Sequence, residues 1–239
     1  MNANLARLGI YSVPDAARIT GASPVHIRGW LQGYAQSRGK SPAPPILHQQ
    51  HEPIAGELAL GFLDLLEVRF LERLGAACRS QGRTLSWRAL RIAAETARAT
   101  FGSEHPFAAK RLHSDGRSVF LEAQQETGDL ALYDLVGNNF AIYDVLVGSF
   151  IASIEYEGDV PRRWRPDETL PRILIDPLRA FGQPIEEKSG APAGTLFNSW
   201  RAEGGNAAKV AAYFDTDPAG VDQSVRYALD LGRTTRRAA

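Results

Sequence analysis

The sequence has a single cysteine, Cys78, among its 239 residues. One thiol cannot form a disulfide within the chain, so a disulfide-stapled fold is excluded and a reducing compartment is favoured. Cys78 falls within an apolar helical pattern, which favours a small core residue over a nucleophile.

Long hydrophobic runs are also missing. No stretch approaches the ~20 apolar residues that span a bilayer, and the first residues lack the apolar core of a signal peptide. We therefore expect a cytoplasmic protein with no membrane partner.

Catalytic and metal-binding motifs are absent as well. Gly204 to Lys209 superficially suggests a phosphate loop, but the four-residue spacer and the Gly-Lys-Ser/Thr ending are missing. Glu155 and Glu157 would share one face of a strand, with no nucleophile or metal ligand nearby. Glu186-Glu187-Lys188 is predicted to be a solvated turn. We expect no enzyme, no cofactor and no metal, because none of the histidines has metal-ligand spacing: His26, His48, His51, His105 and His113.

An excess of charge of either sign is lacking too. Lys plus Arg and Asp plus Glu both number 27, which argues against a protein coated in nucleic acid. Locally the balance differs, since Met1 to Gly56 holds five Arg or Lys against two acids. This leaves room for one basic contact patch.

The strongest positive signal is a four-position pattern near the start of the chain. Ala17 is small, as required where two helices cross at close range, and Gly21 can adopt the left-handed backbone of a tight turn. Ile27 and Trp30 lie one helical turn apart and can close a core against Ala17. Two short helices joined in this way form a helix-turn-helix, a motif that binds DNA.

Capping residues support the same two helices. Ser12 can cap the first helix, and Asp15 lies where a capping-box acid belongs. Ser23 can cap the second helix, with Pro24 at the first helical position, where a missing N–H costs nothing.

The second helix leaves several polar side chains for DNA. Arg can donate two hydrogen bonds to guanine, while Ser and His can contact bases or phosphates. The Pro-rich segment Tyr34 to Pro45 is predicted to form a wing whose cations reach the backbone. A helical hairpin used only for packing or protein contact is the alternative. The residues predicted to contact DNA are Ser23, His26, Arg28, Arg38 and Lys40.

The middle of the chain begins with two predicted helices. Glu57 to Arg79 is apolar on two sides of its first half, so it must be buried by more than a single face. A homodimer interface and a buried central helix both explain this pattern. Thr84 to Phe101 is a second, amphipathic helix.

Shorter β elements are predicted after these helices. Arg111 to Leu121 is expected to form a hairpin with Asp115-Gly116 as its turn. Leu130 to Leu135 and Phe140 to Val147 are rich in β-forming residues, although the second can continue into a short helix. Further strands are expected at Ile154 to Tyr156 and Arg162 to Arg165.

The last third starts with β structure and ends in helices. Arg172 to Pro177 is predicted to be a strand and Phe181 to Pro192 a second extended piece. Three helices are expected at Gly194 to Glu203, Ala207 to Phe214, and Pro218 to about Leu231, the third capped by Asp217. Ala211, Asp215, Val221 and Ser224 in these last two helices repeat the spacing of the four-position pattern near the start of the chain, but their residue types fit it at only two positions. A protein contact is therefore favoured here over DNA.

We predict an α+β fold that is mainly α. Its expected parts are a winged helix-turn-helix at 1–56, a helical and β-hairpin middle at 57–170, and a three-helix, helix-turn-helix-like domain at 171–239.

Two segments carry a family resemblance. Tyr11 to Trp30 resembles the DNA-binding domain of MerR-type winged-helix regulators. Phe181-Gly182-Gln183-Pro184-Ile185, Gly190-Ala191-Pro192, Trp200 to Gly204 and Val210 to Tyr227 resemble a short bacterial domain found in VapB-type antitoxins, which are encoded beside PIN-domain ribonuclease toxins. Ala191 departs from the family pattern, because it is smaller than the residue usual there.

The resemblance implies a homodimeric antitoxin that represses its own operator DNA and blocks the acidic, Mg²⁺-dependent site of a PIN-domain, VapC-type toxin. Guanidinium groups pair bidentately with carboxylates, so the basic tail could fill that site or be merely solvated. Trp200 could anchor the toxin or belong to the core. The alternative is a MerR-like regulator whose C-terminal domain senses a ligand or protein. The residues predicted to contact the toxin are Arg233, Arg236, Arg237 and Trp200.

Overall fold

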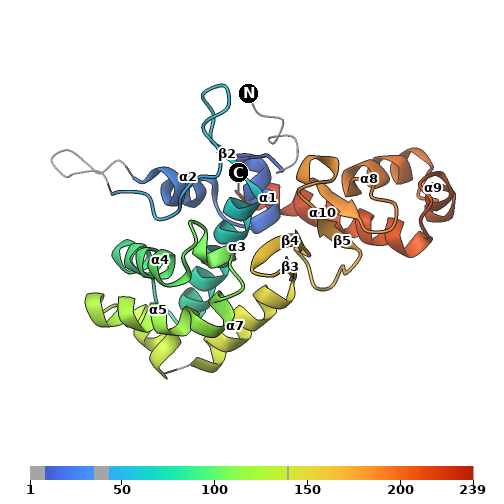
Figure 1. The fold of residues 1–239 in the computed structure, drawn as a ribbon. Coiled ribbons are helices and arrows are strands. Elements are labelled where there is room, and N and C mark those ends of the chain that lie inside the picture. The colour runs from blue at the N-terminus through green and yellow to red at the C-terminus, as the bar shows by residue number, and fades with distance from the viewer. Residues whose placement is uncertain (1–8, 35–42, 139, 239) are drawn as a thin grey trace. The chain divides into compact units, whose positions relative to one another are not determined.

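The computed structural model describes residues 9–34, 43–138 and 140–238 (Figure 1). Within them the fold is α+β and mainly helical, as expected. The chain divides into two compact units. The N-terminal unit consists of Ser12–Ala152 and Tyr156–Pro161, and the C-terminal unit of Met1–Tyr11, Ser153–Glu155 and Arg162–Ala239. The three-part division expected from the sequence stays a prediction.

The N-terminal unit opens with the two predicted helices, α1 (Val13–Thr20) and α2 (Pro24–Gln32). The Ser12 hydroxyl accepts the Asp15 N–H at 3.2 Å, and the Ser23 hydroxyl accepts the His26 N–H at 3.1 Å. Both predicted N-caps are therefore confirmed. The two-residue strands β1 (Tyr11–Ser12) and β2 (Ala59–Leu60) pair with each other.

The central helix of this unit is α3 (Phe62–Ser80), which begins five residues later than predicted. The residues just before it are extended in β2, and Asp64 fixes the start by accepting the Gly61 N–H at 2.8 Å. The apolar sides of α3 are buried within the chain, because Leu65, Leu66 and Phe70 are all fully covered. Of the two explanations for its pattern, a buried central helix is the one that the structure supports.

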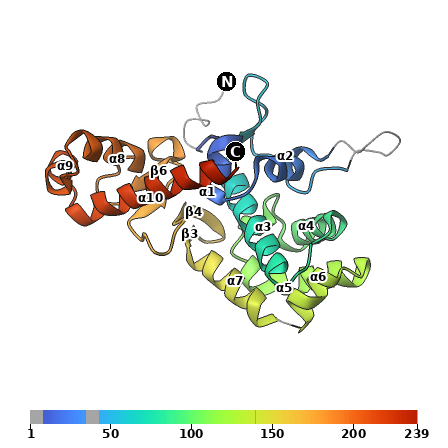
Figure 2. The same cartoon turned by 180° about the vertical axis from the view of Figure 1, so that it is seen from behind.

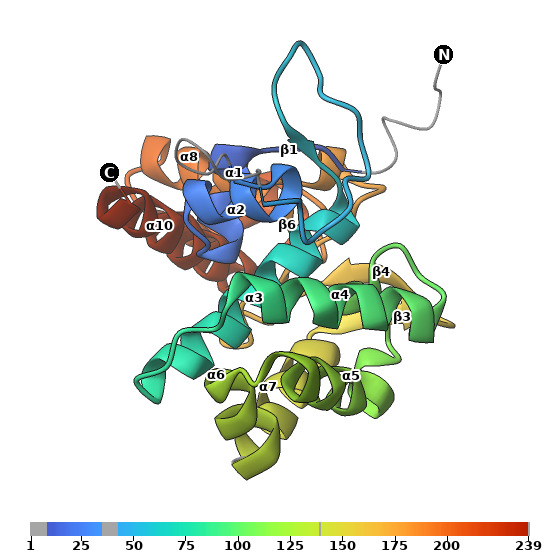
Figure 3. The same cartoon turned by 90° about the vertical axis from the view of Figure 1, so that its left-hand side faces the viewer.

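The predicted hairpin at Arg111 to Leu121 is wrong. The segment lies in helix α5 (Leu112–Thr127), which runs beside α4 (Trp87–Phe101) in Figure 3. Asp115-Gly116 is a strong local turn signal, but Gly116 packs into the core, where an added Cβ would lie 2.5 Å from the Tyr143 hydroxyl. Helical spacing of the buried side chains outweighs the local signal; these are Leu112, Gly116, Val119, Phe120 and Ala123.

The β structure predicted at Leu130 to Leu135 and Phe140 to Val147 is also wrong. These segments form α6 (Leu130–Leu132), the π-helix η3 (Tyr133–Asn138) and α7 (Phe140–Ala152). Asp129 caps α6 by accepting the N–H groups of Ala131 and Leu132, both at 3.0 Å. The short helical segment η2 (Pro106–Ala108) completes the packing. The aromatic side chains that form the common core are Phe70, Phe107, Phe120, Tyr143 and Phe150.

The C-terminal unit is built on a sheet with the strand order β3-β4-β5-β6. Strands β3 (Ile154–Glu157), β4 (Val160–Trp164) and β5 (Ile173–Ile175) lie where strands were predicted. The last strand, β6 (Pro184–Glu186), follows the short helix η4 (Ala180–Gly182) and pairs antiparallel with β5, Leu174 facing Ile185.

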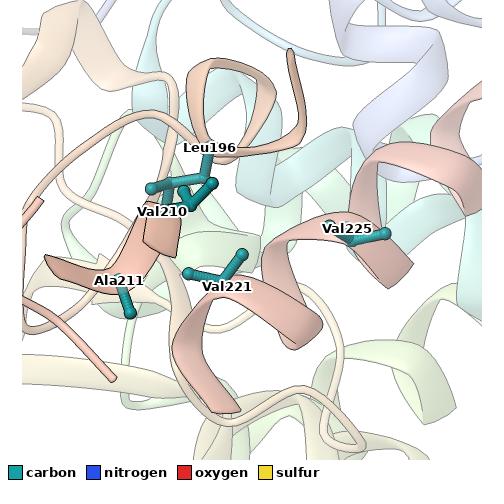
Figure 4. Packing of buried hydrophobic residues seen from close by; sticks show 5 residues of the cluster. All are labelled: Leu196, Val210, Ala211, Val221 and Val225. Atoms are coloured by element: carbon teal, nitrogen blue, oxygen red, sulfur yellow. The ribbon is translucent and has the colours of Figure 1, made fainter. Parts of the chain in front are cut away.

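Three helices follow, as expected: α8 (Ala193–Ala202), α9 (Ala207–Tyr213) and α10 (Pro218–Ala238). Helix α10 is the long red helix of Figure 2 and extends beyond the predicted end near Leu231. Figure 4 shows the apolar cluster that holds the three together, with Leu196, Val210 and Val221 all fully buried. Asp217 caps α10 by accepting the Gly220 N–H at 3.0 Å, as predicted.

Among the described residues, no single helix is long and apolar enough to cross a membrane. One bent pair, Leu130–Gly137 with Ala141–Ala152, meets the length and composition criteria only when its two parts are taken together.

Candidate DNA-binding and partner-binding sites

The four predicted positions of the first helix-turn-helix have the expected geometry. Ala17 is buried where α1 meets α2, and Gly21 has a φ of 78°, in the left-handed region. Ile27 is fully buried and Trp30 is 6% exposed. Arg69 of α3 donates a 2.8 Å hydrogen bond to the Thr20 carbonyl, which ties the turn to the central helix.

The predicted DNA-contacting residues of α2 do not share one face. His26 stacks on Trp30, with ring centroids 5.4 Å apart, and its Nδ1 lies 3.9 Å from a Glu72 carboxylate oxygen. The Ser23 hydroxyl is engaged as the N-cap. Arg28 is exposed, and its guanidinium has no hydrogen-bond or ion-pair partner within the part of the chain that the structure describes. Arg28 is therefore the cation of α2 that is available for a ligand.

Two further residues belong to the outward face of α2. Val25 is 63% exposed and Gln32 is exposed, so Val25, Arg28 and Gln32 follow one another at helical spacing. Our sequence prediction missed both neighbours, because it considered charge and hydrogen-bonding capacity before position. The i, i+3, i+7 spacing was the signal that could have identified them.

The base of the predicted wing is a short antiparallel pair. Tyr34 and Ala43 exchange backbone hydrogen bonds of 3.1 and 3.0 Å. Trp87 of α4 packs edge-on against Tyr34 and donates to the Pro44 carbonyl at 3.3 Å. The predicted contact residues Arg38 and Lys40 lie outside the described residues.

The second helix-turn-helix is closer to the first than its residue types suggested. Ala211 and Val221 are buried, and Asp215 has a φ of 51°, so it adopts the left-handed turn conformation without a glycine. Asp is among the residues that tolerate this conformation best. Ser224 is fully buried, and its hydroxyl is satisfied there by donating a 2.8 Å hydrogen bond to the Gly220 carbonyl. All four positions thus have the helix-turn-helix geometry, although the residue types fit the sequence pattern at only two of them.

The outward side of this second motif has a different charge. Ser23, His26 and Arg28 of the first motif correspond in spacing to Asp217, Gly220 and Asp222 of the second. Asp217 is ion-paired, and Asp222 is exposed. Two carboxylates replace the polar and basic side chains, so this face is unsuited to a phosphate backbone.

The prediction of a solvated turn at Glu186-Glu187-Lys188 is wrong for Glu186, which is fully buried. Its Oε1 accepts from the Arg172 Nη2 at 2.7 Å, and its Oε2 accepts from the hydroxyls of Ser189 at 2.7 Å and Thr216 at 2.9 Å. Arg172 also donates to both carboxylate oxygens of Asp217, at 2.7 and 2.6 Å. This network joins the sheet to the turn between α9 and α10.

The charges of this network support one another. Burial acts to raise the pKa of Glu186, but hydrogen bonds from Ser189 and Thr216 outweigh it and hold that pKa below its ordinary value. The Arg172 guanidinium likewise lowers the pKa of Asp217. Both carboxylates are therefore ionised in the folded protein at neutral pH.

The predicted toxin contacts are spread over two helices. Trp200 of α8 is half-buried and packs against the cluster of Figure 4, with Phe197 stacked at a centroid distance of 6.3 Å. It therefore belongs to the core packing of the three helices. Positions 233, 236 and 237 lie in the last turns of α10, so this segment is helical along its backbone.

The N-terminal unit holds a separate buried cluster of titratable groups. The His105 Nδ1 lies 3.1 Å from a Glu67 oxygen and 3.6 Å from an Asp64 oxygen, and both carboxylates are fully buried. Burial raises the pKa values of Asp64 and Glu67. Burial acts to lower the pKa of His105, but its hydrogen bond to Glu67 outweighs this and raises it.

The cluster also has a structural role. Glu67 accepts the Phe107 N–H at 3.0 Å, and Asp64 accepts the Gln50 N–H, so α3 is tied to two loops. His51, the residue that follows Gln50, is also buried, and its Nε2 has no hydrogen-bond partner in the described part of the chain. Among the described residues, no group of three or more His, Cys, Asp or Glu has a geometry that could hold a metal ion.

Cys78 is buried in α3, as its sequence context predicted. Burial raises the pKa of its thiol to about 11. Because the thiolate is the reactive form, this thiol is a poor nucleophile.

Comparisons with known proteins give a curated protein of similar sequence and a solved structure of similar fold. No protein-family model matches the chain. The chain is 22% identical over 208 residues to a protein of Mycobacterium tuberculosis named "Putative antitoxin VapB45", and the match covers 81% of this chain and 83% of the relative. The crystal structure of Rv2018 from Mycobacterium tuberculosis has a TM-score of 0.66 and 19% identity, covering 90% of this chain and 96% of that one. This chain is thus similar to a protein named as an antitoxin, and it shares its fold with a solved mycobacterial protein.

Proposed function

We propose that this protein is a VapB-type antitoxin that binds a PIN-domain ribonuclease toxin and represses its own operon by binding operator DNA. The observation that carries the proposal is the similarity, along most of the chain, to a protein named as an antitoxin. The geometry of α1 and α2 supports the DNA-binding part.

For DNA binding, α2 is the recognition helix. Its outward face presents an apolar side chain, a guanidinium and an amide at Val25, Arg28 and Gln32. These groups match a thymine methyl, a guanine edge and an adenine edge, respectively. The His26 ring and the wing cations Arg38 and Lys40 then contact the phosphate backbone, which fixes the register of the helix.

For toxin binding, the C-terminal turns of α10 are the basic element. The spacing of Arg233, Arg236 and Arg237 places these three positions along one side of a helix. Guanidinium groups recognise carboxylates bidentately, and a PIN-domain nuclease site is built of carboxylates. Trp200 contributes by holding α8 against α10, and its remaining exposed edge is a predicted toxin contact.

The protein acts as a homodimer in this proposal, since a two-fold operator requires two recognition helices about one DNA turn apart. The apolar positions of α3 are buried within the chain, so this proposal does not assign the dimer contact to them. Solution mass, measured with and without the partner, tests this part.

The DNA-binding part is tested by a gel shift with the chain's own promoter at ~50 and ~200 mM salt. The expected result is a specific shift that weakens strongly as salt rises, because phosphate contacts release counterions. Absence of a shift at both salt concentrations would refute DNA binding.

The toxin-binding part is tested by co-expression with the protein encoded by the neighbouring reading frame. A PIN-domain protein that co-purifies with this chain, and whose ribonuclease activity falls on binding, is the expected outcome. A truncation after Gly232 tests the tail, and full neutralisation by that variant would refute a role for Arg233, Arg236 and Arg237.

A further inference from the structure

The chain between α2 and α3 forms a loop that is closed at its base. Residues 52 to 57 are all exposed, and this loop stands out from the helices in Figures 1 and 3. Asp64 of α3 accepts the backbone N–H groups at both ends of the loop, from Gln50 at 3.1 Å and from Gly61 at 2.8 Å. A single carboxylate therefore closes the base of loop 50–61.

The residues just before this base hold the end of α2. The Trp30 carbonyl accepts the backbone N–H groups of residues 46 and 47, both at 2.9 Å. The Gln49 side chain donates to the Leu31 carbonyl at 2.9 Å. The last carbonyls of a helix have no partner within the helix, so this stretch of chain supplies partners for α2 and then passes directly to the base that Asp64 closes.

Asp64 belongs to a buried group of charges, which we call the histidine–acid cluster: His105, Asp64 and Glu67. The His105 Nδ1 lies 3.1 Å from a Glu67 oxygen and 3.6 Å from an Asp64 oxygen, and both carboxylates are fully buried. The two carboxylates are three residues apart on α3 and therefore share one side of the helix. A buried charge is costly without a partner of opposite sign. The protonated His105 ring is the cation that offsets both.

Other titratable groups lie around the cluster. His51 is buried, its Nε2 has no hydrogen-bond partner in the described part of the chain, and it acts electrostatically on Asp64. Glu104 adjoins His105 and pairs near the surface with the His48 Nδ1 at 2.6 Å. Burial acts to lower the pKa of His105, but the surrounding carboxylates outweigh it and raise that pKa. The imidazolium is thus favoured at neutral pH and is lost on the alkaline side.

We propose that the histidine–acid cluster is a pH-sensitive clamp that closes loop 50–61 and fixes the end of α2. While His105 is protonated, its charge balances Asp64, which holds both ends of the loop. When His105 loses its proton, two buried carboxylates remain without a cation, and hydration relieves their repulsion. Water then replaces the N–H groups of Gln50 and Gly61 on Asp64, so the base of the loop opens.

The loop is the side of the cluster that yields. On the other side Glu67 accepts the Phe107 N–H at 3.0 Å, and Phe107 is fully buried in the aromatic core. Residues 52 to 57 are exposed, so opening the loop uncovers little apolar surface, and local opening occurs where few apolar contacts are lost. Gln49 adjoins the opened base, so its hydrogen bond to the Leu31 carbonyl loosens with it. The clamp in this way transmits pH to the end of α2.

The test is hydrogen exchange of the free chain, followed by NMR at about pH 6 and about pH 9. Protection factors are compared, because they remove the pH dependence of the intrinsic exchange rate. The Gln50 and Gly61 N–H groups are expected to lose protection by about tenfold as the pH rises, and the two N–H groups bound to the Trp30 carbonyl by about threefold. The Gly128 N–H, which bonds to the Gln124 carbonyl at the end of α5, is the internal control and is expected to be unchanged.

Variants assign the response to the cluster. His105→Asn retains a hydrogen-bond donor but cannot be protonated, so the base of the loop is expected to be weakly protected at both pH values. His48→Asn is the matched control, since it makes the same change at an exposed histidine, and it is expected to keep the wild-type response. Glu67→Gln gives a second route if His105→Asn does not fold. It removes a carboxylate that holds the proton on His105, so the opening is expected to move to lower pH.

The outcomes that overturn the clamp are distinct. Equal protection of Gln50 and Gly61 at both pH values overturns it, as does a wild-type response in His105→Asn or in Glu67→Gln. An equal loss at Gly128 means that the whole unit opens, which also overturns it. A response at the loop base with unchanged protection of the N–H groups bound to Trp30 overturns the link to α2. These measurements use neither DNA nor toxin, so the clamp and the proposed function are tested separately.

Discussion

The chain contains the helix-turn-helix frame twice, and the two copies differ in how each is held and in what each presents. In the first, Gly21 makes the turn and Arg28 faces solvent without a partner among the described residues. In the second, Asp215 makes the turn and carboxylates occupy the outward positions. The same backbone frame therefore serves two chemistries, and only the first suits DNA. Geometry alone does not identify a DNA-binding motif.

The largest expected effect concerns stability, because the Glu186 network supports the second helix-turn-helix. Glu186→Ala is expected to destabilise the C-terminal unit by about 3–5 kcal/mol, because it removes a fully buried carboxylate that accepts from Arg172, Ser189 and Thr216 and leaves those donors without this acceptor. The neighbouring Glu187→Ala is the control, and it is expected to cost under about 1 kcal/mol since its ion pair with Arg165 is at the surface. Denaturant unfolding measures both, and equal costs for the two glutamates would contradict the network.

The second prediction addresses the outward faces. Arg28→Ala is expected to weaken operator binding by about 10- to 100-fold, the usual range for a base-reading arginine. Asp222→Ala, its counterpart in the second frame, is expected to leave DNA affinity within about twofold, because a surface that repels phosphate takes no part. Gel shifts at one salt concentration compare the two. A large gain of affinity from Asp222→Ala would show that both frames contact DNA.

The third prediction exchanges the turn residues. Gly21→Ala is expected to cost about 1–2 kcal/mol, since a Cβ is strained at a φ of 78° even though its nearest neighbour, the Arg69 Nη1, would lie at an ordinary contact distance of 3.8 Å. Asp215→Gly is expected to stabilise the second turn by up to about 1 kcal/mol for the opposite reason. Thermal unfolding measures the pair, and effects of the same sign would mean that the two turns are not equivalent.

The smallest effect is a difference in pH dependence between the two units. In the N-terminal unit, Asp64, Glu67 and His105 all have raised pKa values. Groups that hold protons more tightly when folded stabilise the fold at low pH and lose that contribution as the pH rises through their folded pKa values. We expect this unit to melt roughly 3–6 °C lower at pH 8 than at pH 6.

The C-terminal unit is expected to respond in the opposite direction. The lowered pKa of Glu186 gives a stabilisation that is present above its ordinary value near 4.5 and is lost as the pH falls through its lower folded pKa. Calorimetry of wild type and Glu67→Gln separates the units, because Glu67→Gln is expected to flatten the pH 6 to 8 response while leaving the acid response unchanged. An unaltered pH 6 to 8 response in Glu67→Gln would exclude the cluster as its source.

What the sequence could predict follows the range of the interactions involved. The two helices of the first frame were predictable because Ser12, Ser23 and Gly21 act within three or four residues. The hairpin prediction failed because Asp115-Gly116 is a local turn signal, whereas burial against Tyr143 comes from a helix some 25 residues away.

The candidate sites show the same limit. Arg28 was predicted from its position in α2, whereas the exposure of Val25 required the packing of the helix to be known. The burial of Glu186 depends on Ser189 in the adjoining turn and, more distantly, on Arg172 and Thr216, which lie on two other segments. No pattern local to Glu186-Glu187-Lys188 distinguishes a buried glutamate from a solvated one.

The hydrogen bond from Tyr11 to Gly182 has a consequence for synthesis. Its two residues are 171 positions apart, so the earliest described segment of the chain waits for the ribosome to finish most of the remainder. Helices α1 and α2, by contrast, emerge together and need only α3 to close their core. A chain whose translation stops near residue 160 therefore holds the finished first helix-turn-helix but lacks Gly182, whose carbonyl accepts from the Tyr11 hydroxyl. Interrupted synthesis would therefore complete the first helix-turn-helix while leaving the C-terminal unit without strands β5 and β6.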